Sequence, residues 1–117
     1  MNLLYTYSML TFLTYAEKLY IGESIRDKDI ERIKYNLRNN PALCGVYLLA
    51  LSEAEGNLLE FYNARLLQLP IYKNYRKHII GIAGSEEEAV QMVADIMEEC
   101  FDNTGGYNVK EYLGKCS

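Results

Sequence analysis

The residues with the clearest chemical signature are Gly81 and Gly84, followed by Ser85 and three consecutive glutamates. Glycines before a helix can let a phosphate approach the free N–H groups at the helix N-terminus. The stretch lacks, however, the third glycine of a dinucleotide-binding loop and the Gly-Lys-Ser/Thr ending of a P-loop. Three carboxylates in the first turn would also repel a bound anion. We therefore interpret the stretch as a structural helix start, in which Ser85 and Glu88 form a capping box.

Catalytic and metal-binding patterns are weak in the rest of the chain. His78 is the only histidine, and the three cysteines stand far apart. A structural zinc site needs about four Cys or His ligands, usually in close pairs. Cys44 and Cys100 are instead expected to be small buried hydrophobes, with free thiols that suit a reducing cytosol. The sequence thus predicts no catalytic residue, no metal site and no cofactor.

One group of residues could form a pocket for a small ligand. Ser52 and Glu55 follow one predicted strand, and Ser85 follows the next one along the chain. If the two strands are parallel, both loops lie at the edge of the sheet where α/β proteins bind ligands. This expectation rests on analogy between folds.

A second group is basic and lies among tyrosines. Lys73, Arg76 and Lys77 are interleaved with Tyr72 and Tyr75, as in platforms for single-stranded nucleic acid. The formal net charge of -4 argues against a polyanion as the main partner, because nucleic-acid affinity depends on a positive surface. The last predicted helix ends in carboxylates, with no Lys or Arg to offset them. We therefore expect the basic residues to pack against this acidic helix end, in the same chain or in a second one.

Hydrophobic spacing and turn residues predict that the elements positioning these groups follow the order α-α-β-α-β-α. The elements are expected at about residues 5–20, 24–39, 45–52, 58–69, 78–84 and 86–101. A strand, a helix and a second strand in succession suggest a parallel βαβ crossover. We therefore expect an α/β (or α+β) fold, with a small sheet flanked by helices, in a single globular domain over residues 1–117.

The first segment is ambiguous between helix and strand. Apolar residues from Tyr5 to Tyr20 follow helical spacing, whereas the threonines and tyrosines favour a strand over residues 3–15. As a helix, the segment would carry a second apolar face, which a surface helix seldom needs. This face and the 11 tyrosines of the chain suggest contact with a second subunit through Tyr7, Leu10 and Tyr15.

No targeting or membrane-spanning segment is evident in the sequence. Residues 1–16 carry no charged side chain, but no basic region precedes them and hydroxyl residues interrupt the apolar run. The run is also shorter than the ~20 residues needed to span a bilayer. We therefore expect a cytoplasmic protein that does not act in a membrane.

Five stretches of the chain have a familiar order: "LYIGESI", "GVYLLAL", "LLQLPIYK", "HIIGIAGSEEEAVQMV" and "TGGYNVKEYL". Together they resemble a group of small bacterial proteins of unknown function, mainly from Gram-positive gut anaerobes. The likeness covers residues 19–113 and is weak at the N-terminus. It implies a bacterial cytosolic protein and carries over no site residues.

These observations favour a non-catalytic interaction module that forms a homo-oligomer, most simply a dimer. Two alternatives stay open. One is a module that binds a small ligand at the strand ends. The other is an accessory nucleic-acid-binding protein that uses the segment from Tyr72 to Lys77.

Overall fold

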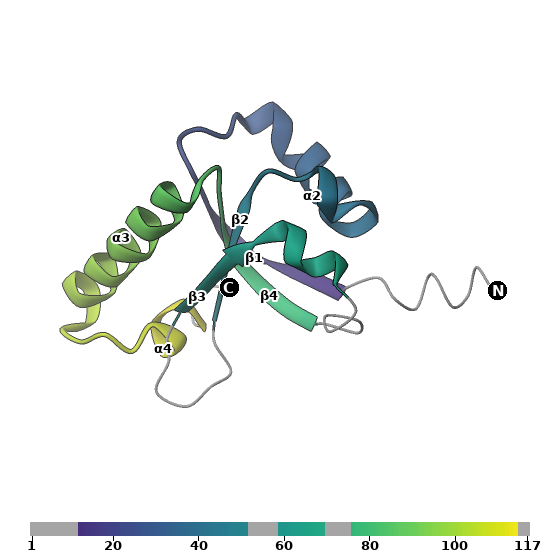
Figure 1. Cartoon of the computed structure of the whole chain (residues 1–117). Helices are drawn as coiled ribbons and strands as arrows, with labels where there is room; N and C mark the ends of the chain where they lie inside the picture. Colours follow the sequence, from purple (N-terminus) through teal and green to yellow (C-terminus); the bar gives the residue numbers. More distant parts are fainter. Residues whose placement is uncertain (1–11, 52–58, 70–75, 115–117) are drawn as a thin grey trace.

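A computed structural model of the chain describes residues 12–51, 59–69 and 76–114 (Figure 1). Its centre is a four-stranded mixed sheet with the strand order β1-β4-β2-β3. The strands are β1 (Phe12–Ile21), β2 (Tyr47–Leu51), β3 (Leu59–Asn63) and β4 (Arg76–Ala83). β4 pairs with β1 in parallel and with β2 antiparallel, and β2 pairs antiparallel with β3.

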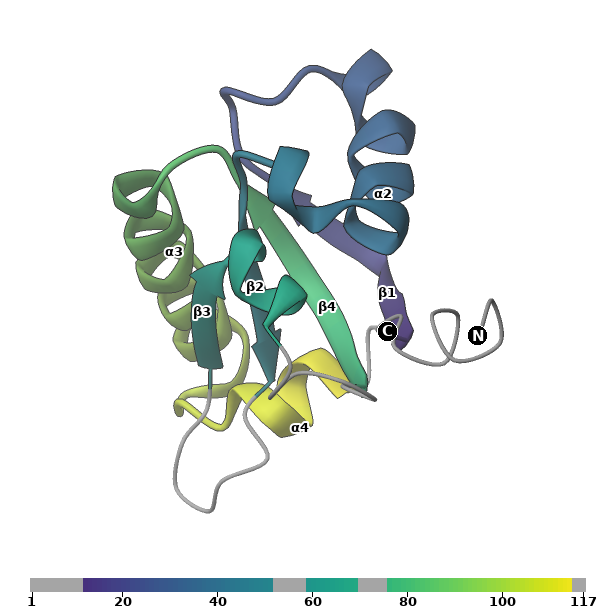
Figure 2. The ribbon, with the colours of Figure 1, turned by 45° about the vertical axis from the view of Figure 1, so that its right-hand side comes forward.

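Helices cover both faces of this sheet (Figure 2). One face carries α3 (Glu86–Thr104) and α4 (Val109–Gly114), and the other carries α2 (Ile30–Asn39) and the 3-10 helix η3 (Ala64–Gln68). Two further 3-10 turns, η1 (Asp27–Asp29) and η2 (Pro41–Leu43), flank α2. The described residues thus form a three-layer arrangement, which confirms the predicted α/β class. None of these helices is both long and apolar enough to cross a membrane.

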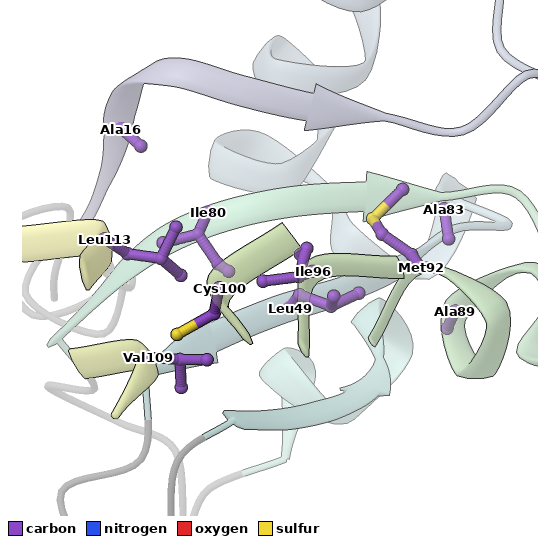
Figure 3. Packing of buried hydrophobic residues seen from close by; sticks show 10 residues of the cluster. All are labelled: Ala16, Leu49, Ile80, Ala83, Ala89, Met92, Ile96, Cys100, Val109 and Leu113. Atoms are coloured by element: carbon purple, nitrogen blue, oxygen red, sulfur yellow. The ribbon is translucent and has the colours of Figure 1, made fainter. Parts of the chain in front are cut away.

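Each face of the sheet has its own apolar cluster. Figure 3 shows Ile96 and Cys100 of α3 directed toward Leu49 and Ile80 of the sheet. The cluster on the opposite face is made by α2, η3 and the sheet, and its least exposed members are Leu37, Leu48, Ala50, Ala64, Ile79 and Ile82. Cys44 and Cys100 are both free and buried, as the sequence predicted.

β4 contains a bulge at Ile80. Leu49 of β2 lies opposite Gly81, yet the next residue, Ala50, lies opposite Ile79. One extra β4 residue therefore sits between these two pairs, as in a β-bulge. A side chain at Gly81 would meet the Met92 sulfur at 2.8 Å. Glycine at this position lets α3 pack closely against the sheet.

The predicted first helix is wrong for the residues that the structure describes. Phe12–Ile21 is the strand β1, which agrees over residues 12–15 with the alternative strand predicted at residues 3–15 and continues beyond it. Helices cover both faces of β1: Ala16 joins the cluster under α3, while Leu13 and Leu19 pack on the α2 side. A strand buried on both faces carries apolar residues on both. The sequence therefore resembles that of a helix with two apolar faces.

The predicted helix at residues 58–69 is also wrong. Its described part is the strand β3, which pairs with β2, followed by η3. Residues 59–69 thus form no crossover α-helix between β2 and β4, and these two strands are antiparallel. The parallel pair in the sheet is β1 and β4. The predictions for α2, β2, β4 and α3 are confirmed, with ends that differ by a few residues.

Candidate functional site

The parallel strands β1 and β4 end side by side, and a polar junction forms where they end. The Gly22 N–H donates to the Ile82 carbonyl at 2.8 Å, so the loop after β1 starts against the end of β4. The loop after β4 contains Gly84 and Ser85 and leads into α3. Ends of adjacent parallel strands are the usual place for ligands in α/β folds. The contents of this junction therefore bear directly on function.

The carboxylate of Glu88 fills the junction. It accepts hydrogen bonds from the Gly84 N–H at 2.6 Å, the Ser24 hydroxyl at 2.8 Å and the Ser24 N–H at 3.1 Å. The hydrogen bond from Gly84, followed by those from Ser24, holds the pKa of Glu88 below its ordinary value despite partial burial. The chain thus supplies its own anion at the positive end of α3.

Both glycines of the junction are needed for this close approach. A Cβ at Gly22 would collide with the Glu88 carboxylate, and a Cβ at Gly84 would collide with the Ser24 hydroxyl. The glycines therefore fit a carboxylate from the same chain. The preference for a structural helix start over a phosphate site agrees with this geometry.

The capping-box prediction is half right. The Ser85 hydroxyl accepts from the Glu88 N–H at 3.1 Å, as predicted for an N-cap. The Glu88 carboxylate, however, reaches Gly84 and Ser24 instead of returning to the Ser85 N–H. The spacing of Ser85 and Glu88 did not reveal Ser24, which lies 64 residues from Glu88 along the chain.

A second polar cluster surrounds Glu99, near the other end of α3. The Glu99 carboxylate accepts from the Tyr20 hydroxyl at 2.8 Å and from the Tyr112 hydroxyl at 2.5 Å. The Lys18 ammonium lies 4.0 Å away. Burial of Glu99 opposes ionisation, but the two hydrogen bonds and the Lys18 charge outweigh it and lower the pKa. Glu88 and Glu99 thus tie the two ends of α3 to β1 and the loop after it.

The two strands on which the predicted ligand pocket depended are antiparallel. Ser52 and Glu55 lie outside the described residues, and Ser85 is the N-cap of α3. The prediction required parallel strands. Because β2 and β4 are antiparallel, Leu51 at the end of β2 lies at the opposite end of the sheet from Ser85.

The predicted basic patch falls largely outside what the structure describes. Lys73 is not among the described residues, and only the backbone of Arg76 and Lys77 can be placed, opposite Phe12 and Leu13. The expected contact with the acidic end of α3 therefore stays a prediction. Among the described residues, Lys18 of β1 lies near that end, with its ammonium 4.0 Å from the Glu99 carboxylate.

Of the three predicted interface residues, Tyr7 and Leu10 lie outside the described residues. Tyr15 is half-buried between β1 and α2, and the Lys34 ammonium lies 4.7 Å from the centre of its ring. Burial, then the negative charges of Cys44 and Glu31, raises the pKa of Tyr15 to about 12. Much of the Tyr15 side chain is therefore packed within its own chain, on the α2 side of the sheet.

His78 has a partner within the sheet. Its Nδ1 atom lies 2.8 Å from the Thr14 hydroxyl of the neighbouring strand. The histidine therefore has a polar partner, and it lies on an inner strand of the sheet. Across the three described ranges, no group of three or more His, Cys, Asp or Glu side chains could hold a metal ion.

The feature that the sequence did not reveal is the open edge of the sheet at β3. Ala64 donates to the Val46 carbonyl, so Tyr62 and Glu60 are the β3 residues whose backbone groups face β2. By the same alternation, the N–H and C=O groups of Leu59 and Phe61 point away from β2. In the described part of the chain no strand pairs with that side of β3.

Comparison with protein-family models, with curated proteins and with solved structures finds no match to this chain. The resemblance to small bacterial proteins therefore stays a prediction.

Proposed function

We propose that this protein is a non-catalytic interaction module that forms a homodimer through the open edge of β3. The observation that carries the proposal is the regular pairing of this edge strand, whose outward-facing residues Leu59 and Phe61 are apolar. β3 pairs with β2 over five residues without a register shift. It contains neither proline nor lysine, and its one charged residue is Glu60, whose backbone groups face β2.

We place the two-fold axis of the dimer at Phe61, the middle residue of β3, whose backbone groups point outward. Two copies of β3 pair antiparallel around a two-fold axis at Phe61, so that Phe61 exchanges both hydrogen bonds with its partner copy. Leu59 then lies opposite Asn63 of the second copy. Phe61 and Leu59 point to the α3 side of the sheet, where both are half-buried. The two Phe61 rings become cross-strand neighbours, an arrangement that stabilises antiparallel pairs.

The cellular setting of the proposal is the bacterial cytoplasm. The two cysteines within the described residues are free and buried. Free thiols are typical of a reducing compartment. The dimer needs neither a disulfide nor a metal ion.

The test is a pair of variants at Leu59, studied by size-exclusion chromatography with light scattering. Leu59→Pro removes the outward N–H without removing a hydrogen bond to β2, and proline is tolerated at the first residue of an edge strand. Leu59→Ala shortens the side chain but keeps the N–H. We expect a dimer for the native chain and for Leu59→Ala, and a monomer for Leu59→Pro. A native chain that stays monomeric at micromolar concentration would overturn the proposal.

A further inference from the structure

α3 carries a second apolar stripe besides the one that faces the sheet. The core stripe consists of Ala89, Met92, Ile96 and Cys100. Val90, Ala94 and Phe101 lie at positions i, i+4 and i+11, with the half-buried Met97 between them at i+7. Val90 is 53% exposed and Phe101 is 45% exposed. We call Val90, Ala94, Met97 and Phe101 the outer stripe.

Contacts of α3 locate the outer stripe on the side of the sheet that ends in β3. Glu88 and Glu99 lie on one flank of α3, where they bind Ser24 and Tyr20 beside β1. At 3.6 residues per turn, Val90 and Phe101 are on the opposite flank. That flank lies toward β3, since β3 is at the other end of the strand order from β1.

Tyr107 extends the outer stripe beyond the end of α3. Its ring stacks on the Phe101 ring, with centroids 5.1 Å apart and an angle of 21° between the planes. Tyr107 is itself 53% exposed. From Val90 to Phe101 the helix rises by about 16 Å, or three turns. The exposed apolar surface is thus long enough to contact a helix of a partner.

A row of carboxylates borders the outer stripe on its solvent side. Glu87, Glu98 and Asp102 are exposed. Glu87 and Glu98 lie three residues before Val90 and Phe101 and therefore border them. Asp102 lies one turn after Glu98 on the same solvent-facing side. α3 contains no basic residue, and its last turn has none to balance the helix dipole. Carboxylates near a helix C-terminus are unfavourable there, and a nearby cation relieves this. The negative charges beside the outer stripe therefore favour a partner that carries positive charges.

We propose that the outer stripe is a docking surface for a cationic amphipathic helix of another protein. Apolar residues of that helix would pack on Val90, Met97 and Phe101, with the ring of Tyr107 at one end. Its Lys or Arg residues would face Glu87, Glu98 and Asp102. A second copy of α3 does not suit this surface, because it would bring the same row of carboxylates. The inference does not depend on the homodimer.

The probe is a synthetic helical peptide of about 18 residues with leucines on one face and lysines on the other. Binding is measured by isothermal titration calorimetry at about 50 mM and about 300 mM NaCl. Two control peptides are used: one with the same composition in scrambled order, and one with glutamate in place of lysine. We expect the Leu/Lys helix to bind with micromolar affinity that weakens with salt, and neither control to bind.

Matched variants locate the site on α3. The double variant Val90→Ser with Phe101→Ser should weaken binding at least tenfold, because buried aromatic anchors dominate interfaces. Glu98→Lys with Asp102→Lys should weaken it about tenfold and reduce the salt dependence. Tyr35→Ser and Asp27→Lys change similar exposed residues outside α3, and should alter affinity by less than about twofold.

Three results would overturn the docking surface. One is that the scrambled peptide binds as tightly as the Leu/Lys helix. Another is that Asp27→Lys lowers the affinity as much as the double variant Glu98→Lys with Asp102→Lys. The third is unchanged affinity in the Val90/Phe101 variant with a native circular dichroism spectrum. The Leu59→Pro chain separates this inference from the homodimer, because a monomer that still binds the Leu/Lys helix supports docking alone.

Discussion

The two edges of the sheet differ in how they are closed. At the β1 edge, Tyr15 lies opposite Ile79 and Tyr20 opposite Gly81, so four β1 residues face the single residue Ile80. This long bulge exposes Glu17 and Lys18. The β3 edge has no such irregularity. Bulges and charges are common means of preventing edge-to-edge pairing. The contrast teaches that, among the described residues, the β1 edge is the better protected, since the β3 edge has no bulge and only the charge of Glu60.

The two edge strands also differ in how they are attached to the rest of the fold. The β1 side is tied to α3 through Glu99 and, in the loop after the strand, through Glu88. β3 is held through its pairing with β2 and by the turn after it, in which Asn63 accepts from the Arg65 N–H. The protected edge is thus also the one fixed by side-chain hydrogen bonds from α3.

The largest effect is expected on the dimer dissociation constant, when a lysine is placed on the β3 edge and, as a control, on the β1 edge. Phe61→Lys would bring two ammonium groups face to face at the two-fold axis, and we expect the dimer dissociation constant to rise at least 100-fold. Glu17→Lys on the β1 edge should leave the dimer intact. Light scattering over a dilution series compares the two variants. Dissociation by Glu17→Lys alone would show that the edges have been assigned the wrong way round.

A smaller effect is expected when the junction beside β1 is broken. Glu88→Ala removes the acceptor of three hydrogen bonds, and we expect the free energy of unfolding to fall by about 1 to 2 kcal/mol, since the site is open to solvent. Glu87→Ala, one residue away and exposed, should change it by less than about 0.5 kcal/mol. Urea denaturation measures both. If Glu88→Ala and Glu87→Ala lowered the free energy of unfolding equally, the hydrogen bonds of Glu88 would not be what stabilises the junction.

The smallest effect is expected from acid. Glu88 and Glu99 have lowered pKa values in the folded state, so the unfolded state binds more protons as the pH falls. Their contribution to stability is complete above the ordinary glutamate pKa and is lost as the pH falls through their lowered folded-state pKa values. Glu99→Gln should flatten this part of the pH profile, measured by denaturation at each pH. If stability varied with pH in Glu99→Gln as it does in the native chain, Glu99 would not be a source of the acid sensitivity.

Local patterns in the sequence predicted the elements whose environment is local. α3 was predicted because its buried stripe is regular and Ser85 begins it with a side-chain cap. β3 and η3 were taken for one helix because Leu59, Tyr62, Leu66 and Leu69 follow helical spacing, although the backbone changes from strand to 3-10 turn after Asn63. Pairing with β2 decides the strand, and a single segment does not show its pairing partner.

The polar contacts of α3 were likewise predictable only where the partners are close along the chain. The cap at Ser85 was predicted from residues three apart, whereas the partners of Glu88 and Glu99 on the β1 side are 64 and 79 residues distant. No periodicity connects Ser24 with Glu88 or Tyr20 with Glu99. Only the parallel pairing of β1 with β4 brings these groups together.

The order of the strands also has a kinetic consequence. β2 and β3 are neighbours along the chain and pair antiparallel, so they form a local hairpin. Pairing of β1 with β4 joins Phe12 to Arg76, and closing this longer loop carries a greater entropic cost than closing the hairpin. Local contacts form before distant ones in most small domains. We therefore expect the hairpin to assemble early, so that newly synthesised chains expose the β3 edge before β1 has joined the sheet.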